Sequence, residues 1–148
     1  MFEFIIVLIA FFGMELSAWA AHKYLMHGFL WFLHEDHHVV TGKPYQKNDS
    51  FALIFAIPSA LGFVLGSIYS LSWLVSIGFG ILLYGFAYLF VHDIFIHRRI
   101  KFFKRTKNKY LRAVLHAHRI HHSERSRVNC EYFGMLYVPR TIFQSMKS

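Results

Sequence analysis

Ten of the eleven histidines in this sequence fall into four short clusters with a repeated spacing. A pair separated by four residues is followed by a triplet with the spacing H-x2-H-H, and the same order recurs in the second half of the chain. The members are His22 and His27, His34, His37 and His38, His92 and His97, and His118, His121 and His122. Neutral imidazole is the commonest metal ligand in proteins. Four matched clusters therefore predict a metal centre, whereas a lone histidine would more often be an interfacial polar or pH-sensitive group.

The two kinds of cluster present their rings differently on a helix. In H-x2-H-H, positions i, i+3 and i+4 are neighbours on one face, so three nitrogens can converge toward a metal ion. In H-x4-H, five residues turn a regular α-helix through about 500°, which leaves the two rings about 140° apart. Either the helix breaks between the members of each pair, or the two rings serve different metal ions. We expect the second arrangement.

The number of imidazoles indicates how many metal ions the clusters could hold. Two six-coordinate ions offer about twelve positions, so ten imidazoles would leave about two for oxygen, water or a bridging group. A structural zinc site would be closed at four ligands. An open, nitrogen-rich site for two metals suits redox-active iron, although zinc could substitute in such a cage. The single cysteine, Cys130, excludes an intramolecular disulfide and a thiolate metal cluster.

Four charged residues are candidates for supporting these ligands. Ligating imidazoles usually donate their second N–H to a carboxylate or a carbonyl. Asp36 and Asp93 adjoin predicted ligands, so we expect them to accept such hydrogen bonds. Glu15 interrupts an apolar stretch, where an ionisable group is costly and is by default a functional candidate. We expect it to contact another element, either a histidine N–H or Arg119.

The elements that carry these residues are predicted to be membrane helices. Hydrophobic residues make up 55% of the 148 residues and charged residues only 16%, against about 25% in soluble domains. No Asp, Glu, Lys or Arg occurs between Asp49 and Asp93, which leaves room for two crossings of about 20 residues each. We expect a single all-α, membrane-embedded domain. It comprises residues 1–148, with spanning helices at about 4–21, 51–68 and 73–91.

The charge distribution predicts the orientation of the chain in the membrane. All 16 Lys and Arg residues lie in the segments 22–50 and 92–148, which also carry the histidine clusters. By the positive-inside rule these segments are cytoplasmic and the N-terminus is outside. The basic run 98–109 could suit nucleic acid, but directly after a membrane helix it more often lies on anionic lipid headgroups. We expect the lipid bilayer as its partner and no nucleic acid.

Two further segments are predicted on the cytoplasmic side. Residues 109–122 place Leu111, Val114 and His118 along one face, which is typical of an interfacial helix. The apolar run 132–138 is too short to span the bilayer. We expect it to dip into the interface or to cap the metal centre.

Four segments of the chain resemble the motifs of the bacterial β-carotene 3-hydroxylases, which belong to the membrane fatty acid hydroxylase superfamily. They are residues 21–28 (AHKYLMHG), 34–38 (HEDHH), 91–97 (VHDIFIH) and 117–122 (AHRIHH), and the likeness extends from about Phe12 to Pro139. The resemblance implies a non-haem diiron monooxygenase that uses O2 to hydroxylate C3 of β-ionone rings. Its substrate would be β-carotene, converted through β-cryptoxanthin to zeaxanthin, and the ten clustered histidines would hold the iron.

This chemistry implies a partner and a location. Two electrons per turnover must come from outside, because the chain has no flavin, haem or nicotinamide signature such as G-x-G-x-x-G. We expect a ferredoxin-like donor, whose acidic surface the basic cytoplasmic face would attract. The resemblance implies a protein of the bacterial inner membrane with its active site on the cytoplasmic side.

Other functions share parts of this pattern. A fatty-acid or sterol hydroxylase has the same metal chemistry, and a ketolase acting on C4 of the ring is another relative, although its histidine motifs read differently. A non-catalytic membrane protein that binds or transports metal ions needs the same kind of ligands. Two irons per chain together with oxygen-dependent turnover would distinguish the enzyme from this last alternative.

Overall fold

The structure, a computed structural model, describes residues 1–39, 45–101 and 106–146. Within these ranges every regular element is a helix, which confirms the all-α prediction. In chain order the elements are α1 (Phe2–Ala20), η1 (Ala21–Phe29), α2 (Trp31–His38), η2 (Lys47–Asp49), α3 (Ser50–Ile68), α4 (Ser72–Tyr88), η3 (Leu89–Ile96), α5 (Lys109–Ser123) and α6 (Arg140–Ser145). Of these, η1 and η3 are π-helical and η2 is a short 3-10 turn.

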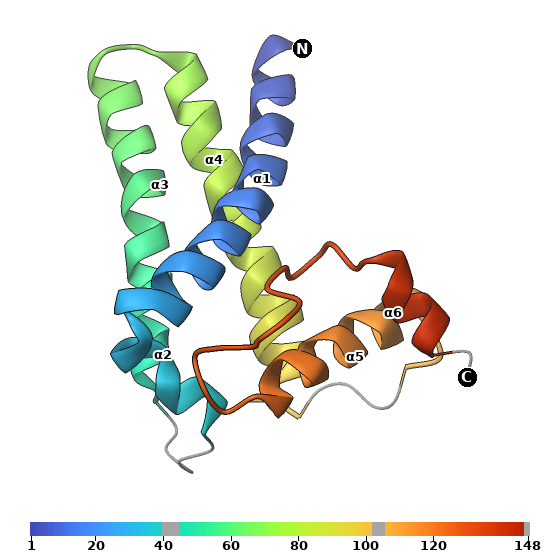
Figure 1. Ribbon diagram of the computed structural model, residues 1–148. Coiled ribbons are helices and arrows are strands. Elements are labelled where there is room, and N and C mark those ends of the chain that lie inside the picture. The colour runs from blue at the N-terminus through green and yellow to red at the C-terminus, as the bar shows by residue number, and fades with distance from the viewer. Residues whose placement is uncertain (40–44, 102–105, 147–148) are drawn as a thin grey trace.

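Three helical stretches of the described chain are long and apolar enough to cross a membrane, as predicted. They are Phe2–Phe29, Lys47–Ile68 and Ser72–Ile96. The first and third run from α1 and α4 directly into the π-helices η1 and η3, so both extend beyond the apolar stretches of the sequence. Figure 1 shows the N-terminus and the α3–α4 turn at one end of the bundle, with α2 and α5 at the other. The histidine-bearing elements therefore gather at a single end.

Small residues let the spanning helices approach closely. Gly62 of α3 faces Gly78 of α4, and a Cβ on Gly62 would lie 2.9 Å from the Gly78 Cα. Gly80 faces α1, where its Cβ would lie 2.6 Å from the Ala10 Cβ. Across the α3–α4 contact, Ser59 Oγ donates to the Gly78 carbonyl at 2.8 Å. Because lipid provides no hydrophobic force between apolar helices, close packing and such hydrogen bonds hold them together.

Segments from the last third of the chain cover the histidine-bearing end. The helix predicted over residues 109–122 is present as α5, which lies across the end of the bundle (Figure 1). Its Ala113 and Ala117 pack against Ile142 of α6 in a small buried core. The short helix α6 was not predicted. Residues 102–105 of the basic run and residues 40–44 of the segment 22–50 lie outside the described residues, as do residues 147–148.

Replacing Gly80 with Ala tests the contact between α1 and α4. The added methyl group would meet the Ala10 side chain and the Val7 carbonyl at 2.6 Å, so the helices must separate. We expect G80A to lower the free energy of unfolding by about 1–3 kcal/mol, as overpacking generally does, measured by denaturant titration in detergent micelles. Gly85 of α4 has open space at its Cβ position, so G85A should leave stability unchanged or raise it. Equal effects of the two substitutions would contradict this packing.

Candidate metal centre

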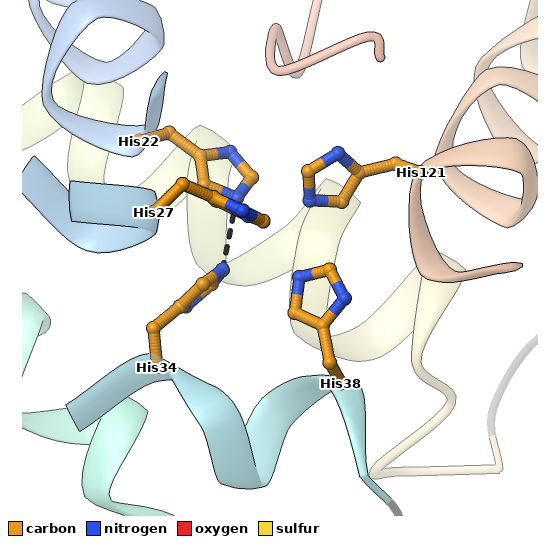
Figure 2. Close-up of side chains that lie close together, drawn as sticks. All are labelled: His22, His27, His34, His38 and His121. Atoms are coloured by element: carbon orange, nitrogen blue, oxygen red, sulfur yellow. Dashed lines mark hydrogen bonds between the residues drawn. The ribbon is translucent and has the colours of Figure 1, made fainter. Parts of the chain in front are cut away.

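The clustered histidines meet at one place, although they come from segments far apart in the sequence. A first histidine group, with candidate ligand atoms within 4.8 Å of one another, consists of His22, His27, His34, His38 and His121 (Figure 2). A second histidine group, defined in the same way, consists of His37, His97, His118 and His122. His92 adjoins the second group, with its Nε2 3.2 Å from that of His37. The two groups touch through the rings of His38 and His122, whose centroids are 4.5 Å apart.

The π-helical turns explain why the members of each H-x4-H pair lie side by side. The expectation that the two rings serve different metal ions is wrong for His22 and His27, which belong to the same group. Hydrogen bonds between residues five apart bring residue i+5 over residue i, as where the His97 N–H donates to the His92 carbonyl at 2.9 Å. The ring centroids are 5.2 Å apart in the first pair and 4.5 Å in the second. A wider helical turn, rather than a break, thus aligns each pair.

Each H-x2-H-H triplet divides between the two groups, so the expected convergence of all three nitrogens on one ion is wrong. On α2, His34 and His38 belong to the first group and His37 to the second. On α5 the division is reversed, because only His121 belongs to the first group. The rings of a triplet spread over about 100° of the helix surface, which is enough to reach two adjacent sites. Each helix thereby supplies ligand candidates to both groups and joins them into one centre.

Every ring of the first histidine group donates a hydrogen bond from Nδ1. The acceptors are the backbone carbonyls of Phe133 for His22, Arg127 for His27, Glu124 for His38 and Glu131 for His121, at distances of 2.8 to 3.3 Å. The Nδ1 of His34 donates to the Asn48 Oδ1 at 2.6 Å. Because carbonyl oxygens only accept hydrogen bonds, each of these rings carries its proton on Nδ1 and keeps a lone pair on Nε2.

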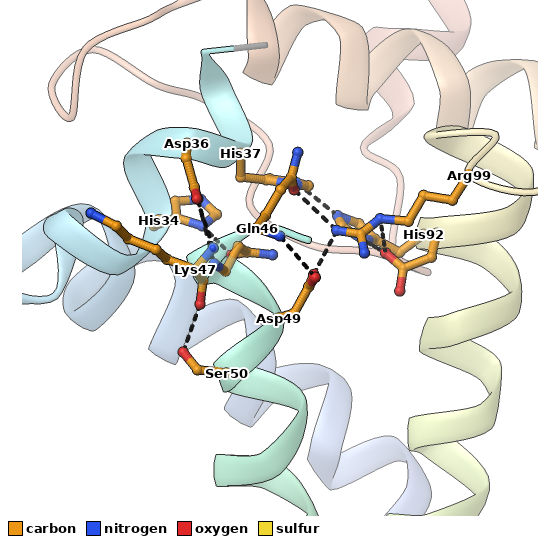
Figure 3. Close-up of polar contacts among 11 residues, drawn as sticks. His34, Asp36, His37, Gln46, Lys47, Asp49, Ser50, His92 and Arg99 are labelled. Atoms are coloured by element: carbon orange, nitrogen blue, oxygen red, sulfur yellow. Dashed lines mark hydrogen bonds and ion pairs between the residues drawn. The ribbon is translucent and has the colours of Figure 1, made fainter. Parts of the chain in front are cut away.

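Side chains hold the second group in a similar way. His37 donates from Nδ1 to the Gln46 Oε1 at 3.0 Å, and His92 donates to the Asp93 carboxylate at 2.9 Å. Arg99 donates to the same Gln46 oxygen at 3.0 Å and to the carboxylate of Asp49, the last residue of η2, at 2.6 Å (Figure 3). This network ties the start of α3 to the end of η3, and so fixes both helices relative to the second group.

Burial keeps the imidazoles uncharged. Loss of hydration lowers the pKa of His34 to about 2, and it lowers the pKa of His37 and of His121 to about 3. The pKa of His97 falls to about 4 for the same reason. At neutral pH these rings are therefore neutral, and each can offer a lone pair to a cation.

The Nε2 lone pairs face one another without protons between them. The Nε2 atoms of His22 and His34 are 3.0 Å apart, and neither can donate to the other because both rings are protonated on Nδ1. Four further buried Nε2 atoms have no hydrogen-bond partner among the described residues, namely those of His27, His38, His121 and His122. Two nitrogens at adjacent positions of one metal ion lie about 3 Å apart, because metal–nitrogen bonds are about 2.1 Å long. The donor set therefore fits metal ions.

The two aspartates support the centre in different ways. Asp93 accepts from His92, as expected. Asp36 accepts instead from the backbone N–H groups of Lys47 and Asn48, at 2.6 and 3.4 Å (Figure 3). It thus holds the turn that presents Asn48 to the ring of His34. Asp36 therefore supports a ring through Asn48, whereas we expected it to accept a hydrogen bond from a ring itself.

Glu15 and Arg119 lie in surroundings that differ from the expectation. The Glu15 carboxylate accepts from the Tyr84 hydroxyl and from the backbone N–H groups of residues 135–137, so its partners are neither a histidine nor Arg119. Arg119 is exposed on α5, where it lines a surface cavity with Arg112 and His116. The carboxylate binds a distant segment of backbone, which spacing along the sequence could not indicate.

Sequence reasoning missed most of the groups that accept hydrogen bonds from the rings. Gln46 and Asn48 are ordinary residue types for a turn and belong to no motif. Backbone carbonyls carry no signal in residue type, because every residue has one. The run 132–138, expected to dip into the interface or to cap the centre, contributes Phe133, whose ring packs on the rings of His22 and His121 at 5.4 and 5.1 Å.

Comparison with known proteins places this geometry in context. The chain matches the fatty acid hydroxylase family over residues 7–143. It is 40% identical to the beta-carotene hydroxylase of Pantoea ananas, over 91% of this chain and 77% of that protein. It is 35% identical to a beta-carotene hydroxylase of Paracoccus sp., over 94% of this chain and 86% of that protein.

A plant protein is similar over a smaller share of its length. The chloroplastic beta-carotene 3-hydroxylase of an Oncidium hybrid cultivar is 42% identical over 76% of this chain, which corresponds to 38% of the plant protein. No solved structure matches the chain.

Replacing Asn48 with Leu removes the acceptor for the His34 Nδ1 and keeps the side chain similar in size. Losing a partner of this kind typically lowers metal affinity about 10–100-fold. We expect N48L to show such a loss, measured by competition with a chelator of known affinity. Glu35 lies on the exposed side of α2, so E35Q should bind metal like the wild type. Equal affinities of N48L and wild type would contradict a supporting role for this hydrogen bond.

Proposed function

The chain belongs to the fatty acid hydroxylase family, and from this premise we propose that it hydroxylates C3 of the β-ionone rings of carotenoids. In this proposal β-carotene is converted through β-cryptoxanthin to zeaxanthin. The observation that carries it is the gathering of all ten clustered histidines at one centre, in a chain whose relatives over most of its length are named beta-carotene hydroxylases. The name of the Oncidium relative supports position 3.

The ten histidines would hold two iron ions, one in the first histidine group and one in the second group with His92. Iron would supply the activation of O2 and the oxidation of an unactivated ring C–H bond, which no side chain can perform. Zinc could occupy the same nitrogens, but it has no redox chemistry. In each turnover one oxygen atom enters the C–H bond and the other leaves as water, which consumes two electrons and two protons.

The protein's own contribution is to orient and shield the ligands. Hydrogen bonds from Nδ1 to carbonyl oxygens and to Asp93 orient seven of the ten rings and raise the basicity of their Nε2 atoms. Trp31 packs on His27 and His38 with centroids 5.2 and 5.3 Å apart, and Tyr88 stacks on His92 at 4.5 Å. These aromatic rings limit access of water, which suits oxidation of a hydrocarbon.

The substrate would reach the centre from the lipid. Residues 1–148 would form one membrane-embedded domain in the bacterial inner membrane. The elements that carry the histidine groups lie at one end of the three apolar helices (Figure 1), and α1 has no buried residue, which leaves its outer side free to face lipid. All Lys and Arg residues lie in the two segments that also carry the histidines. By the positive-inside rule, the centre would then be on the cytoplasmic side.

The electrons would come from an acidic, ferredoxin-like protein. A surface cavity of about 700 Å³ on the outer side of α5 is lined by Lys107, Arg112, His116 and Arg119 together with Thr106, Leu115 and Met146. The same helix carries His118 toward the centre, so a donor bound outside would be about one helix diameter, roughly 10 Å, from the ligands. No Asp or Glu lies between Asp93 and Glu124 in the sequence, so the field here attracts acidic partners.

Charge reversal on this side of α5 tests the donor site. We expect R112E/R119E to slow metal reduction by reduced ferredoxin at least about tenfold at low ionic strength, because electrostatic steering raises association rates by about 10–10³-fold. Reduction by a small uncharged mediator should be unchanged. R140E, a reversal at an exposed position of α6, is the control. Wild-type rates in R112E/R119E, or rates indifferent to salt, would contradict a donor site on α5.

Expression in a β-carotene-accumulating bacterium tests the proposed function. We expect β-cryptoxanthin and zeaxanthin, identified by chromatography and mass spectrometry, and about two irons per purified chain. H121A and H37A, one from each histidine group, should abolish the product. Hydroxylated fatty acids or sterols without hydroxylated carotenoids would indicate a different substrate, and metal transport without any product would contradict an enzyme.

A further inference from the structure

One irregular stretch, residues 124–137, lies over the first histidine group, and we call it the cover. Four of its backbone carbonyls accept the Nδ1 hydrogen bonds of four rings in that group. The Phe133 ring also packs on the rings of His22, His27 and His121, with centroids 5.1 to 5.4 Å apart. The cover therefore orients four of the five rings of the first group through backbone atoms.

The cover has no regular secondary structure to keep it in place. Residues 124–139 contain no helix or strand. Within them, Asn129 and Tyr132 have φ values of 63° and 59°, in the left-handed region that non-glycine residues rarely adopt. Such a conformation persists when the surrounding structure imposes it. Contacts with the rest of the chain must therefore hold the cover.

Glu15 supplies such a contact from the spanning helix α1. Its Oε1 accepts hydrogen bonds from the three successive N–H groups of residues 135–137, at 3.0, 2.8 and 3.0 Å. Its Oε2 accepts from the Tyr84 hydroxyl of α4 at 2.8 Å. The carboxylate thus fastens the end of the cover to two spanning helices, two residues beyond Phe133, whose carbonyl holds His22.

The backbone just before residues 135–137 passes close to the Glu15 carboxylate. A Cβ at Gly134 would lie 3.3 Å from the Glu15 Oε1, so the glycine lets the backbone approach the acceptor closely. Hydrogen bonds to an ionised acceptor are about twice as strong as neutral ones. A carboxylate within a spanning helix is costly, and four donors offset that cost. Without Glu15 these donors would lose their acceptor, and the cover would lose three hydrogen bonds that tie its end to α1.

Among the described residues, no hydrogen bond links a ring of the second histidine group, or His92 beside it, to the cover. The described Nδ1 acceptors for His37 and His92 are Gln46 and Asp93, which lie next to η2 and within η3 and are not part of the cover. The described acceptors therefore differ, with backbone carbonyls of the cover for four rings of the first group and side chains near the helix ends for His37 and His92.

We propose that Glu15 is a latch that holds the cover closed, so that the first histidine group keeps its metal ion only while Glu15 binds residues 135–137. The second group keeps its ion independently. This rests on the proposed function, in which each group holds one metal ion. Glu15 acts through the cover rather than on a ring, and is a positioning residue.

The iron content of the purified full-length chain after loading with Fe(II) tests the latch. E15L removes both acceptor oxygens, and we expect iron to fall from about two per chain to about one. E15Q keeps one uncharged acceptor and should lie between these values. E3L removes an exposed carboxylate from the other end of α1 and should keep about two irons.

A second-group variant identifies which site E15L empties. H97A alone should bind about one iron, and the double variant E15L/H97A should bind about none. A double variant that retains one iron would mean that both substitutions empty the same site, which would overturn the latch.

Cys130 reports the position of the cover directly. It is the single cysteine of the chain, it is partly buried within the cover, and its Sγ donates to the Ser126 carbonyl at 3.3 Å. We expect maleimide to label Cys130 at least about tenfold faster in E15L than in the wild type, which corresponds to closure weakened by about 1.4 kcal/mol. E3L should label at the wild-type rate.

The outcomes distinguish failure of the latch from failure of the proposed function. Wild-type protein that binds no iron would contradict the proposed function. E15L protein with about two irons and the wild-type labelling rate would contradict the latch alone. If E15L does not accumulate as folded protein, E15Q decides, because full iron content with unchanged labelling of Cys130 in E15Q overturns the latch.

Discussion

Ten neutral imidazoles crowded at the end of an apolar helix bundle impose the constraint on which the rest of the structure depends. Burial favours the uncharged ring, and an uncharged ring needs an acceptor for its N–H. For seven of these rings the described chain meets that need with carbonyls, amides and a carboxylate arranged around the outside of the centre. As a result the lone pairs point inward, and the Nε2 atoms of His22 and His34, 3.0 Å apart, are placed to bind one cation together.

This constraint accounts for the unusual helices. A regular α-helix would turn His22 and His27 away from each other. The π-helical turns instead stack residues five apart, and they occur where α1 and α4 leave the apolar part of the bundle. π-Helical turns are rare in proteins as a whole, and those that occur are often found at functional sites. Here the π-helical turns let each of two spanning helices direct a pair of histidine rings toward one centre.

The two histidine groups are supported by different parts of the chain. Side chains near η2 and η3 accept hydrogen bonds from His37 of the second group and from His92 beside it, close to the spanning helices. The first group depends on carbonyls of residues 124–133, which reach it only after the C-terminal third has folded back over the bundle. The centre is therefore complete only when the first and last parts of the chain meet, and Glu15 lies where they do.

Residue type and spacing by themselves determined the membrane helices and marked the ten clustered histidines as candidate metal ligands, because long apolar runs and clustered imidazoles are properties of local sequence. The tertiary structure decided how those imidazoles divide. His37 joins rings from α5 and η3 rather than its neighbours His34 and His38, since small differences in direction on one helix select between adjacent sites. It also decided the partners of Glu15 and of the Nδ1 atoms, because backbone N–H and C=O groups are the same in every residue and only folding brings particular ones together.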